Sequence, residues 1–154
     1  HRHSSAASDV YKRQISWKAP AGGGTTDYAV DIFRAAVEYG HYECFVSEDT
    51  RLPMMYMDDA IRATERIMQV DLESLGDSRT GYNIKGISFT AGELADKIAE
   101  RIPGFTCDFV PDFRQKVAES WPNDVDDQAA RDDWGWKADY DLGRMVDEMI
   151  SNIS

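Results

Sequence analysis

The sequence predicts a mixed α/β fold, because segments with helical periodicity alternate with short strand-like segments along most of its length. The helices are indicated by apolar residues at a 3.6-residue period, and the strands by short runs of β-branched, aromatic and sulfur-containing side chains. The strands are too few and too scattered for a complete doubly wound sheet. A length of 154 residues is typical of one domain.

The first predicted helix follows a glycine-rich stretch. Thr25 or Thr26 can cap its start, and Gly40 is suited to end it. Its apolar residues fall at helical spacing, and they are Ala29, Ile32, Phe33, Ala36 and Val37. A strand is expected directly afterwards, over residues 42–46.

The middle of the chain is predicted to contain two further strands and a helix. Residues 54–57 read as a strand, and Asp58 can cap the helix behind it. We expect residues 82–84 to form an edge strand of the sheet, with the helix over 58–68 packed against that sheet.

The last part of the chain contains four expected helices and one strand. Thr90 and Glu93 match the T-x-x-E capping box at the start of the first helix. A strand is expected over 105–110, and a short helix should begin at Asp112. The remaining helices are predicted over residues 126–134, with Gly135 as the stop, and from Asp141 to the end.

Charge and composition exclude several classes of partner. The chain has 28 acidic and 17 basic side chains, a formal net charge of -11, which would repel nucleic acid and anionic membranes. No apolar run approaches the roughly 20 residues needed to span a bilayer. The three histidines do not predict a metal site. Cys44 and Cys107 are expected to be buried free thiols in a reducing compartment.

Residues 1–14 show neither helical nor strand periodicity and few apolar side chains. We therefore expect a disordered leader that is not native to the fold, followed by one structural unit over residues 15–154.

The stretch AGGGTTDY over residues 21–28 is the most informative for function. Consecutive glycines before a helix allow close approach of the backbone to a ligand, and N–H groups at a helix start favour an anion such as a carboxylate. The hydroxyls of Thr25 and Thr26 lie at the same place. On these residues alone, a flexible loop followed by an ordinary N-cap is the slightly favoured interpretation.

A second candidate is Trp121 in the sequence ESWP, at the expected end of a short helix. Its ring and indole N–H could line a pocket, or the ring could belong to the core. Trp134 and Trp136 lie beside a helix-stopping glycine, and packing is the better interpretation for both. Arg51 is expected to form a structural ion pair rather than to bind a substrate.

Taken together, these segments resemble the L-threonine 3-dehydrogenases of the extended short-chain dehydrogenase superfamily. The resemblance runs from Ile15 to the end of the chain, and GGGTTDY joined to RLPMMY and SWP is its most specific part. It is carried by five segments: ISWKAPAGGGTTDYAVDIF, TRLPMMYMDDAIRAT, YNIKGISFTAGELA, DFRQKVAESWP and DDQAARDDWGWKADYDL.

The resemblance implies the carboxy-terminal, substrate-binding part of such an enzyme, with the last strand and helices of a Rossmann-like fold. The parent enzyme would oxidise L-threonine to 2-amino-3-oxobutanoate with NAD as hydride acceptor. The family's catalytic Tyr-x-x-x-Lys motif is absent, since none of the seven tyrosines has a lysine four residues on. The sequence also lacks a glycine fingerprint behind a strand, so we expect neither catalytic nor NAD-binding residues here.

The resemblance also assigns the substrate side of the site. It implies that Gly24 and Thr25 contact the amino acid near its polar end, that Trp121 closes the pocket, and that Thr26 is a second contact. It further implies a homodimeric parent, cytoplasmic in bacteria, although a mitochondrial eukaryotic parent is also compatible. Two alternatives stay open: part of a nucleotide-sugar epimerase or dehydratase, and a non-catalytic binding module.

Overall fold

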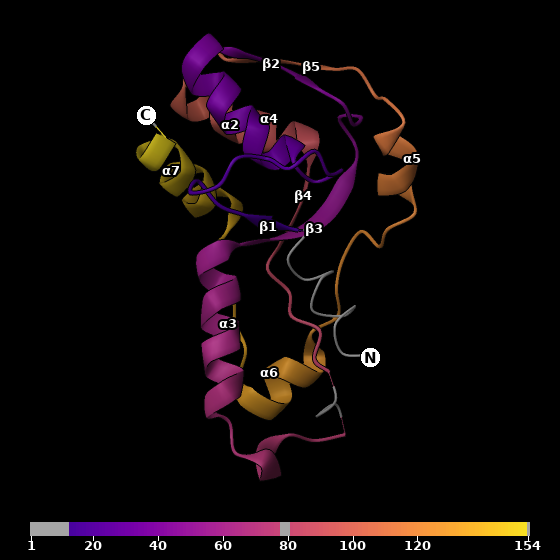
Figure 1. Cartoon of the computed structure of the whole chain (residues 1–154), viewed down its shortest axis with the longest axis vertical. Helices are drawn as coiled ribbons and strands as arrows, with labels where there is room; N and C mark the ends of the chain where they lie inside the picture. The colour runs from indigo at the N-terminus through magenta and orange to yellow at the C-terminus, as the bar shows by residue number, and fades with distance from the viewer. Residues whose placement is uncertain (1–12, 78–80, 154) are drawn as a thin grey trace.

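The elements of the chain form two groups along the long axis of the molecule (Figure 1). The computed structural model describes residues 13–77 and 81–153. One group contains all five strands together with helices α2, α4 and α7, and the other contains α3 and α6. The mixed α/β class predicted from the sequence is therefore confirmed.

The first sheet has three strands in the order β1-β3-β4. β1 (Gln14–Ile15) runs parallel to β3 (Arg51–Tyr56), with Gln14 opposite Met55. β4 (Ile87–Thr90) runs antiparallel to β3 on its other side. A second, two-stranded sheet pairs β2 (His41–Cys44) in parallel with β5 (Thr106–Phe109).

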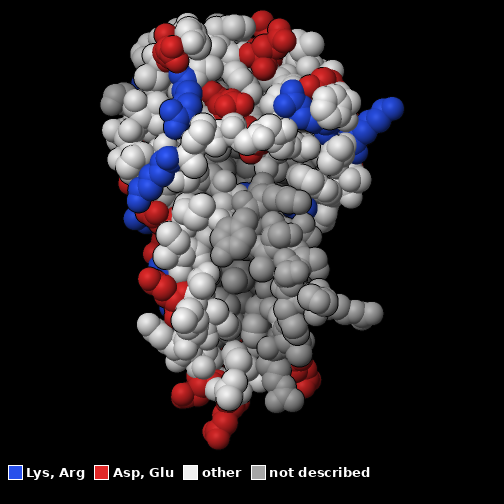
Figure 2. All heavy atoms as spheres, in the orientation of Figure 1, with Lys and Arg blue, Asp and Glu red and all other residues white. Residues whose placement is uncertain are grey.

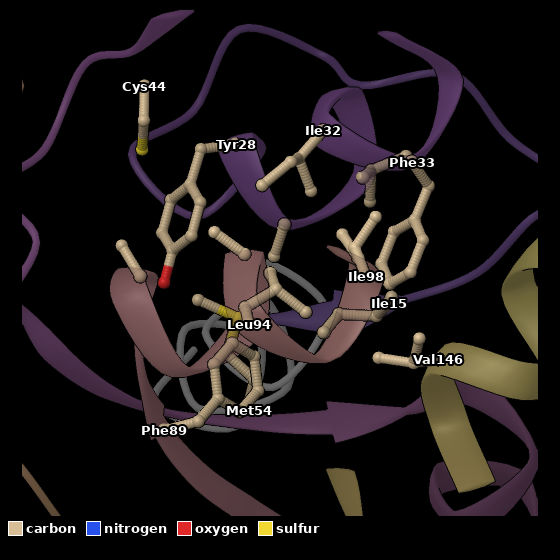
Figure 3. Close-up of a cluster of buried hydrophobic side chains, with 14 of the residues drawn as sticks. Ile15, Tyr28, Ile32, Phe33, Cys44, Met54, Phe89, Leu94, Ile98 and Val146 are labelled. Carbon is tan, nitrogen blue, oxygen red and sulfur yellow. The ribbon is translucent and has the colours of Figure 1, made fainter. Parts of the chain in front are cut away.

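Three helices enclose the main hydrophobic core between themselves and the first sheet (Figure 3). They are α2 (Tyr28–Tyr39), α4 (Ala91–Arg101) and α7 (Leu142–Ile153). Figure 3 shows Phe33 of α2, Ile98 of α4 and Val146 of α7 gathered around Ile15. Each of these side chains is almost completely removed from water, which is the principal source of stability for such a core.

The second group of elements has a smaller core of its own. α3 (Met57–Gln69) continues directly from β3 and is followed by the short 3-10 helix η1 (Leu72–Ser74), and α6 (Gln128–Trp134) packs against α3. Trp136 is 2% exposed there, and its indole N–H donates to the carbonyl oxygen of Lys85 at 2.9 Å. The packing role expected for Trp134 and Trp136 is thus confirmed.

A buried carboxylate joins the start of α3 to the segment that leads into α7. Asp59 is 1% exposed, and its two oxygens accept the backbone N–H groups of Asp139 and Tyr140 at 3.0–3.1 Å. Arg62 donates to the same carboxylate at 2.9 Å and also contacts the carboxylate of Asp139 at 3.2 Å. The negative charge of Asp59 is therefore compensated within the protein.

Several expected helix boundaries are confirmed. Thr90 and Glu93 form a complete capping box at the start of α4. Gly40 and Gly135 adopt left-handed conformations directly after α2 and α6, with φ of 70° and 66°. Asp141 lies just before α7 and accepts the backbone N–H of Arg144.

Three local predictions are wrong. Neither Thr25 nor Thr26 caps α2, because Asp27 occupies that position. Asp58 lies inside the first turn of α3, and the helix is preceded by Tyr56 in extended conformation. Residues 82–84 form no strand; Tyr82 and Ile84 pack against the smaller core, and the chain joins the sheet further on, as β4.

Residues 1–12 of the expected leader lie outside the described residues. Its last two residues do not behave as a leader, because Gln14 belongs to β1 and the carbonyl oxygen of Arg13 accepts the N–H of Met55 at 3.1 Å. The boundary predicted after residue 14 is therefore placed too late. Cys44 and Cys107 are both free thiols, as expected, with Cys44 buried and Cys107 partly buried.

No helix within residues 13–77 and 81–153 is long and apolar enough to cross a membrane. On the face drawn in Figure 2, acidic side chains gather at both ends of the long axis.

Candidate substrate site

The loop between β1 and α2 contains the glycines and threonines selected from the sequence. Gly22, Gly23 and Gly24 are exposed, whereas Thr25 and Thr26 are 9% and 6% exposed. Gly23 has a φ of 94°, a conformation that side chains disfavour, so a glycine is required at this position. The loop thus presents bare backbone to the outside and turns the two threonines inward.

The start of this loop is held to the body of the protein through Trp17. The carbonyl oxygen of Trp17 accepts a hydrogen bond from Arg34 of α2 at 3.1 Å. The Trp17 side chain hydrogen bonds the phenol of Tyr56 at the end of β3. These contacts fix the entry to the loop.

The start of α2 is arranged differently from the expected anion site. The N–H of Ala29 donates to Thr26, and those of Val30 and Asp31 donate to the main-chain oxygen of Asp27, at 2.9–3.1 Å. These donors are therefore already paired with backbone carbonyl groups. The Asp27 carboxylate, itself an anion, lies beside them and accepts the N–H of Gly24 at 2.5 Å. Contrary to expectation, these N–H groups of the first turn are therefore not available to a substrate carboxylate.

Trp121 lies just behind α5 (Arg114–Glu119), which is anchored at its start. The Gln115 side chain accepts the N–H of Ser47 at 2.8 Å and donates to the hydroxyl of Thr50 at 2.9 Å. These bonds hold α5 to the loop between β2 and β3, and so set the position of Trp121.

The segment after Trp121 is held to β4 and the residues before it. Ser88 donates its hydroxyl proton to the carbonyl oxygen of Asn123 at 2.7 Å. Lys85 and Asp124 form an ion pair at 2.7 Å, and the hydrogen bond from Lys85 holds the pKa of the Asp124 carboxyl below its usual value. Trp121 is therefore fixed from both sides along the chain.

The ring of Trp121 is partly buried and packs against the edge of the main core. The guanidinium of Arg13 lies over the ring, 4.4 Å from its centre. The structure therefore brings Gly24, Thr25 and Thr26 together in one loop. For Trp121 it gives contacts with Arg13 and the core edge; its contact with the loop remains a prediction.

Arg51 has the structural role expected for it. Its guanidinium pairs with Glu93 of α4 at 2.6 Å and donates to the carbonyl oxygen of Ser88 at 2.9 Å. The hydrogen bond from the backbone N–H of Thr90 holds the pKa of Glu93 below its ordinary value, and Arg51 makes a smaller contribution in the same direction. Arg51 thus links β3, β4 and α4.

Two hollows of about 600 and 420 Å³ lie away from the selected residues. Residues of α3 and α6 line the larger, including Arg62, Arg66 and Asp133; Lys85, Asp124 and Arg131 line the smaller. Neither contains Gly24, Thr25, Thr26 or Trp121. Within the described ranges, no group of three or more His, Cys, Asp or Glu side chains could hold a metal ion.

Sequence reasoning missed three residues that shape this region. Asp27 could have been found, since aspartate directly before a helical pattern is among the strongest N-cap signals. Gln115 and Arg13 act through partners far away in the sequence, at Thr50 and Trp121, and no local pattern identifies such contacts.

In sequence and fold, the chain is similar to proteins named as dehydrogenases. The chain aligns with the GalE-like L-threonine dehydrogenase of Cupriavidus necator (apo form) with a TM-score of 0.88 and 53% identity, covering 92% of this chain and 50% of that one. It is 48% identical over 142 residues to the mitochondrial L-threonine 3-dehydrogenase of Bos taurus, covering 92% of this chain and 38% of that protein. No protein-family model matches.

A third relative has a different name. An uncharacterised epimerase/dehydratase of Staphylococcus aureus (strain USA300) is 43% identical over 140 residues, covering 90% of this chain and 43% of that protein. By fold, the chain is similar to one part of the GalE-like dehydrogenase it matches. Within that class, the chain is a homologue of the L-threonine 3-dehydrogenases. It spans half or less of the length of these relatives.

Proposed function

We propose that this chain provides the substrate side of an enzyme that oxidises L-threonine to 2-amino-3-oxobutanoate. The observation that carries the proposal is the match to threonine dehydrogenases over 92% of the chain at 48–53% identity, a span that contains the glycine-threonine loop. The acceptor of the hydride from the hydroxyl-bearing carbon would be NAD.

The chain's own contribution is to bind and orient the amino acid. Gly24 lies exposed in the loop, the hydroxyl-bearing Thr25 and Thr26 follow it directly, and Trp121 offers an aromatic wall that can exclude water. The base for the hydroxyl proton must come from elsewhere, because the sequence has no Tyr-x-x-x-Lys motif. It also has no glycine fingerprint that fits NAD, so none of its residues is proposed to hold the cofactor.

Two measurements on the chain test this proposal. L-threonine should bind and should shift the backbone resonances of Gly24 and Thr25 in a ¹⁵N spectrum, while D-threonine should do so far less. Incubation with L-threonine and NAD should give no NADH above a heat-treated sample, because no suitable base is present. L-threonine-dependent turnover by the chain would overturn the division of roles, and absence of specific binding would remove the substrate assignment.

The name of the Staphylococcus aureus relative favours one second candidate, a nucleotide-sugar epimerase or dehydratase. That substrate carries a diphosphate, whereas this chain carries a formal net charge of -11. Titration with a uridine diphosphate sugar distinguishes the two, since specific shifts around Gly24 with the sugar nucleotide and none with L-threonine would favour the second candidate. A third candidate is a non-catalytic binding module, which predicts a different ligand altogether.

The location and assembly of the whole protein follow from the same proposal. A bacterial parent is expected in the cytoplasm and a eukaryotic one in the mitochondrion. The Bos taurus relative is named as a mitochondrial protein. The parent is expected to be a homodimer. A longer sequence that contains this chain should carry Tyr-x-x-x-Lys and a glycine fingerprint, as the proposal requires.

A further inference from the structure

The Asp27 side chain points back along the chain, away from the helix it precedes. An aspartate in this position ordinarily accepts an N–H group two or three residues ahead, in the first turn. Here the side chain makes no such bond. Its Oδ2 instead accepts the N–H of Gly24 at 2.5 Å, while the N–H of Asp27 donates to the carbonyl oxygen of Gly24 at 3.1 Å.

This reciprocal pair closes a four-residue turn at the point where the loop meets α2. The first turn does not need the Asp27 side chain as an acceptor, because the main-chain oxygen of Asp27 already accepts the N–H groups of Val30 and Asp31. A bond from a backbone N–H to a carboxylate is charge-assisted, and is among the stronger hydrogen bonds in proteins. Asp27 therefore stabilises the loop more directly than it caps the helix.

The segment that it holds is rich in glycine. Three consecutive glycines have no side chains to restrict the backbone, and all three are exposed. The contact between Gly24 and Asp27 does not depend on the missing side chain of Gly24. A Cβ on Gly24 would lie 3.5 Å from the Asp27 carboxylate, which is an ordinary contact distance. The hydrogen bond itself defines where the N–H and carbonyl groups of Gly24 point.

We infer that Asp27 is a positioning residue: it fixes the Gly24 backbone, and through Gly24 it shapes the amino-acid site. This inference rests on the proposed function for its ligand, and on the Asp27–Gly24 geometry for its mechanism. It differs from a direct role in which the Asp27 charge binds the ammonium group of the substrate. The two roles separate on substitution, because asparagine keeps an oxygen acceptor for the Gly24 N–H and loses the charge.

The first test uses the chain itself and needs no ligand. In Asp27→Ala, the amide proton of Gly24 should exchange with solvent at least about tenfold faster than in the wild type, because its acceptor is gone. Asp27→Asn should retain most of the protection. The matched control is Asp126→Ala, which removes an aspartate that accepts the N–H of Gln128 at 2.9 Å before α6 and should leave Gly24 unchanged. Unchanged Gly24 exchange in Asp27→Ala would overturn the inference.

The second test measures L-threonine affinity by calorimetry on the same variants. Asp27→Ala should weaken binding about tenfold or more, with Asp27→Asn close to wild type and Asp126→Ala unaffected. Equal loss in Asp27→Asn and Asp27→Ala would overturn positioning in favour of a direct charge role. If the wild type does not bind L-threonine, the proposed function fails and the link to the amino-acid site fails with it. Gly24 exchange still decides whether Asp27 holds the loop. Circular dichroism on each variant checks that α2 is intact.

Discussion

Arg13 covers one face of the Trp121 ring, with its guanidinium carbon 4.4 Å from the ring centre. These residues lie more than a hundred positions apart, and Arg13 is also bonded through its carbonyl oxygen to Met55 of β3. The ring is thus held between the edge of the core and the guanidinium of a residue that directly precedes β1.

In a full-length protein that carries this region, Trp121→Ala should raise the KM for L-threonine about tenfold or more. NAD affinity should stay within about twofold, because the ring is proposed to contact the amino acid alone. Steady-state kinetics with each substrate varied in turn measure both. Trp121→Phe is the matched control, since it keeps an aromatic wall. Equal loss of both affinities would show that Trp121 supports the fold rather than the pocket.

Stability should depend on pH through Glu93. The N–H of Thr90 holds the pKa of this carboxyl below its ordinary value of 4.5, with a further contribution from Arg51. A lowered pKa in the folded state means that the carboxylate stabilises the fold above about pH 4.5, and that the gain is lost as pH falls through the lower value. Glu93→Gln should therefore be less stable than the wild type at pH 7, by no more than about 1 kcal/mol at this exposed site.

Urea unfolding at pH 7, 5 and 3 provides the measurement. The difference between wild type and Glu93→Gln should shrink toward zero at the lowest pH. Glu65→Gln removes an exposed carboxylate of α3 without these hydrogen bonds, and it controls for net charge. A difference that stays constant from pH 7 to pH 3 would contradict the assignment.

The Asp59 carboxylate should be among the most sensitive positions in the chain. Asp59→Ala leaves two backbone N–H groups and Arg62 without their shared acceptor, and breaking a buried charged pair of this kind costs about 3–5 kcal/mol. The exposed neighbour Asp58 accepts a single long bond from Tyr140 at 3.3 Å, so Asp58→Ala should cost less than about 1 kcal/mol. Similar unfolding midpoints for both variants would refute the structural role of Asp59.

Two buried tyrosines should respond in opposite ways to the same substitution. Tyr28 is 0% exposed, and no described residue hydrogen bonds to its hydroxyl; the Tyr56 hydroxyl, on a side chain that is also buried, is bonded by the Trp17 side chain. Tyr28→Phe should leave stability unchanged or raise it by up to about 1 kcal/mol, whereas Tyr56→Phe should lower it by about 1 kcal/mol. Thermal unfolding of both variants measures this, and loss of stability in Tyr28→Phe would reveal a partner for the hydroxyl.

The two thiols should be unreactive in the folded chain. Burial raises the pKa of Cys44 to about 11 and that of Cys107 to about 12, so the reactive thiolate is scarce at neutral pH. Iodoacetamide at pH 8 should modify both thiols far faster in urea than in buffer. Because both pKa values lie above the ordinary 9.0, the stability linked to them is present below pH 9 and is lost as pH rises through 11 and 12. Rapid native alkylation of Cys44 would contradict its burial.

Local patterns were enough to predict most helices, because their apolar faces and capping residues lie within a few positions of one another. The Thr90–Glu93 capping box is an example, and it is present as expected. The strand expected over 82–84 shows where local information stops. Tyr82 instead packs edge-on against Trp134, and the backbone approaches β3 at Gly86, where a Cβ would lie 2.6 Å from the main-chain oxygen of Met54. Which of two short apolar runs pairs with β3 is decided by these distant contacts.

For the candidate site, the sequence identified the loop but not what holds it. The threonines were expected to cap α2, whereas both are turned inward and Asp27 takes the position. Several polar residues compete for one helix start, and the outcome depends on how the loop enters it. Here the Trp17 contacts to Arg34 and Tyr56, outside the motif, determine that entry.

The Asp59 bonds also determine the order in which this protein can be completed during its synthesis. The ribosome releases Asp59 about 80 residues before the amide groups of Asp139 and Tyr140 that it will bind. Until then Arg62, three residues further on, is the nearest partner of the carboxylate, and the first turn of α3 cannot be buried in its final form. The two element groups therefore cannot mature one after the other from the amino terminus. Residues 139 and 140 have to emerge before α3 reaches its native surroundings, so α3 stays incompletely packed throughout that interval.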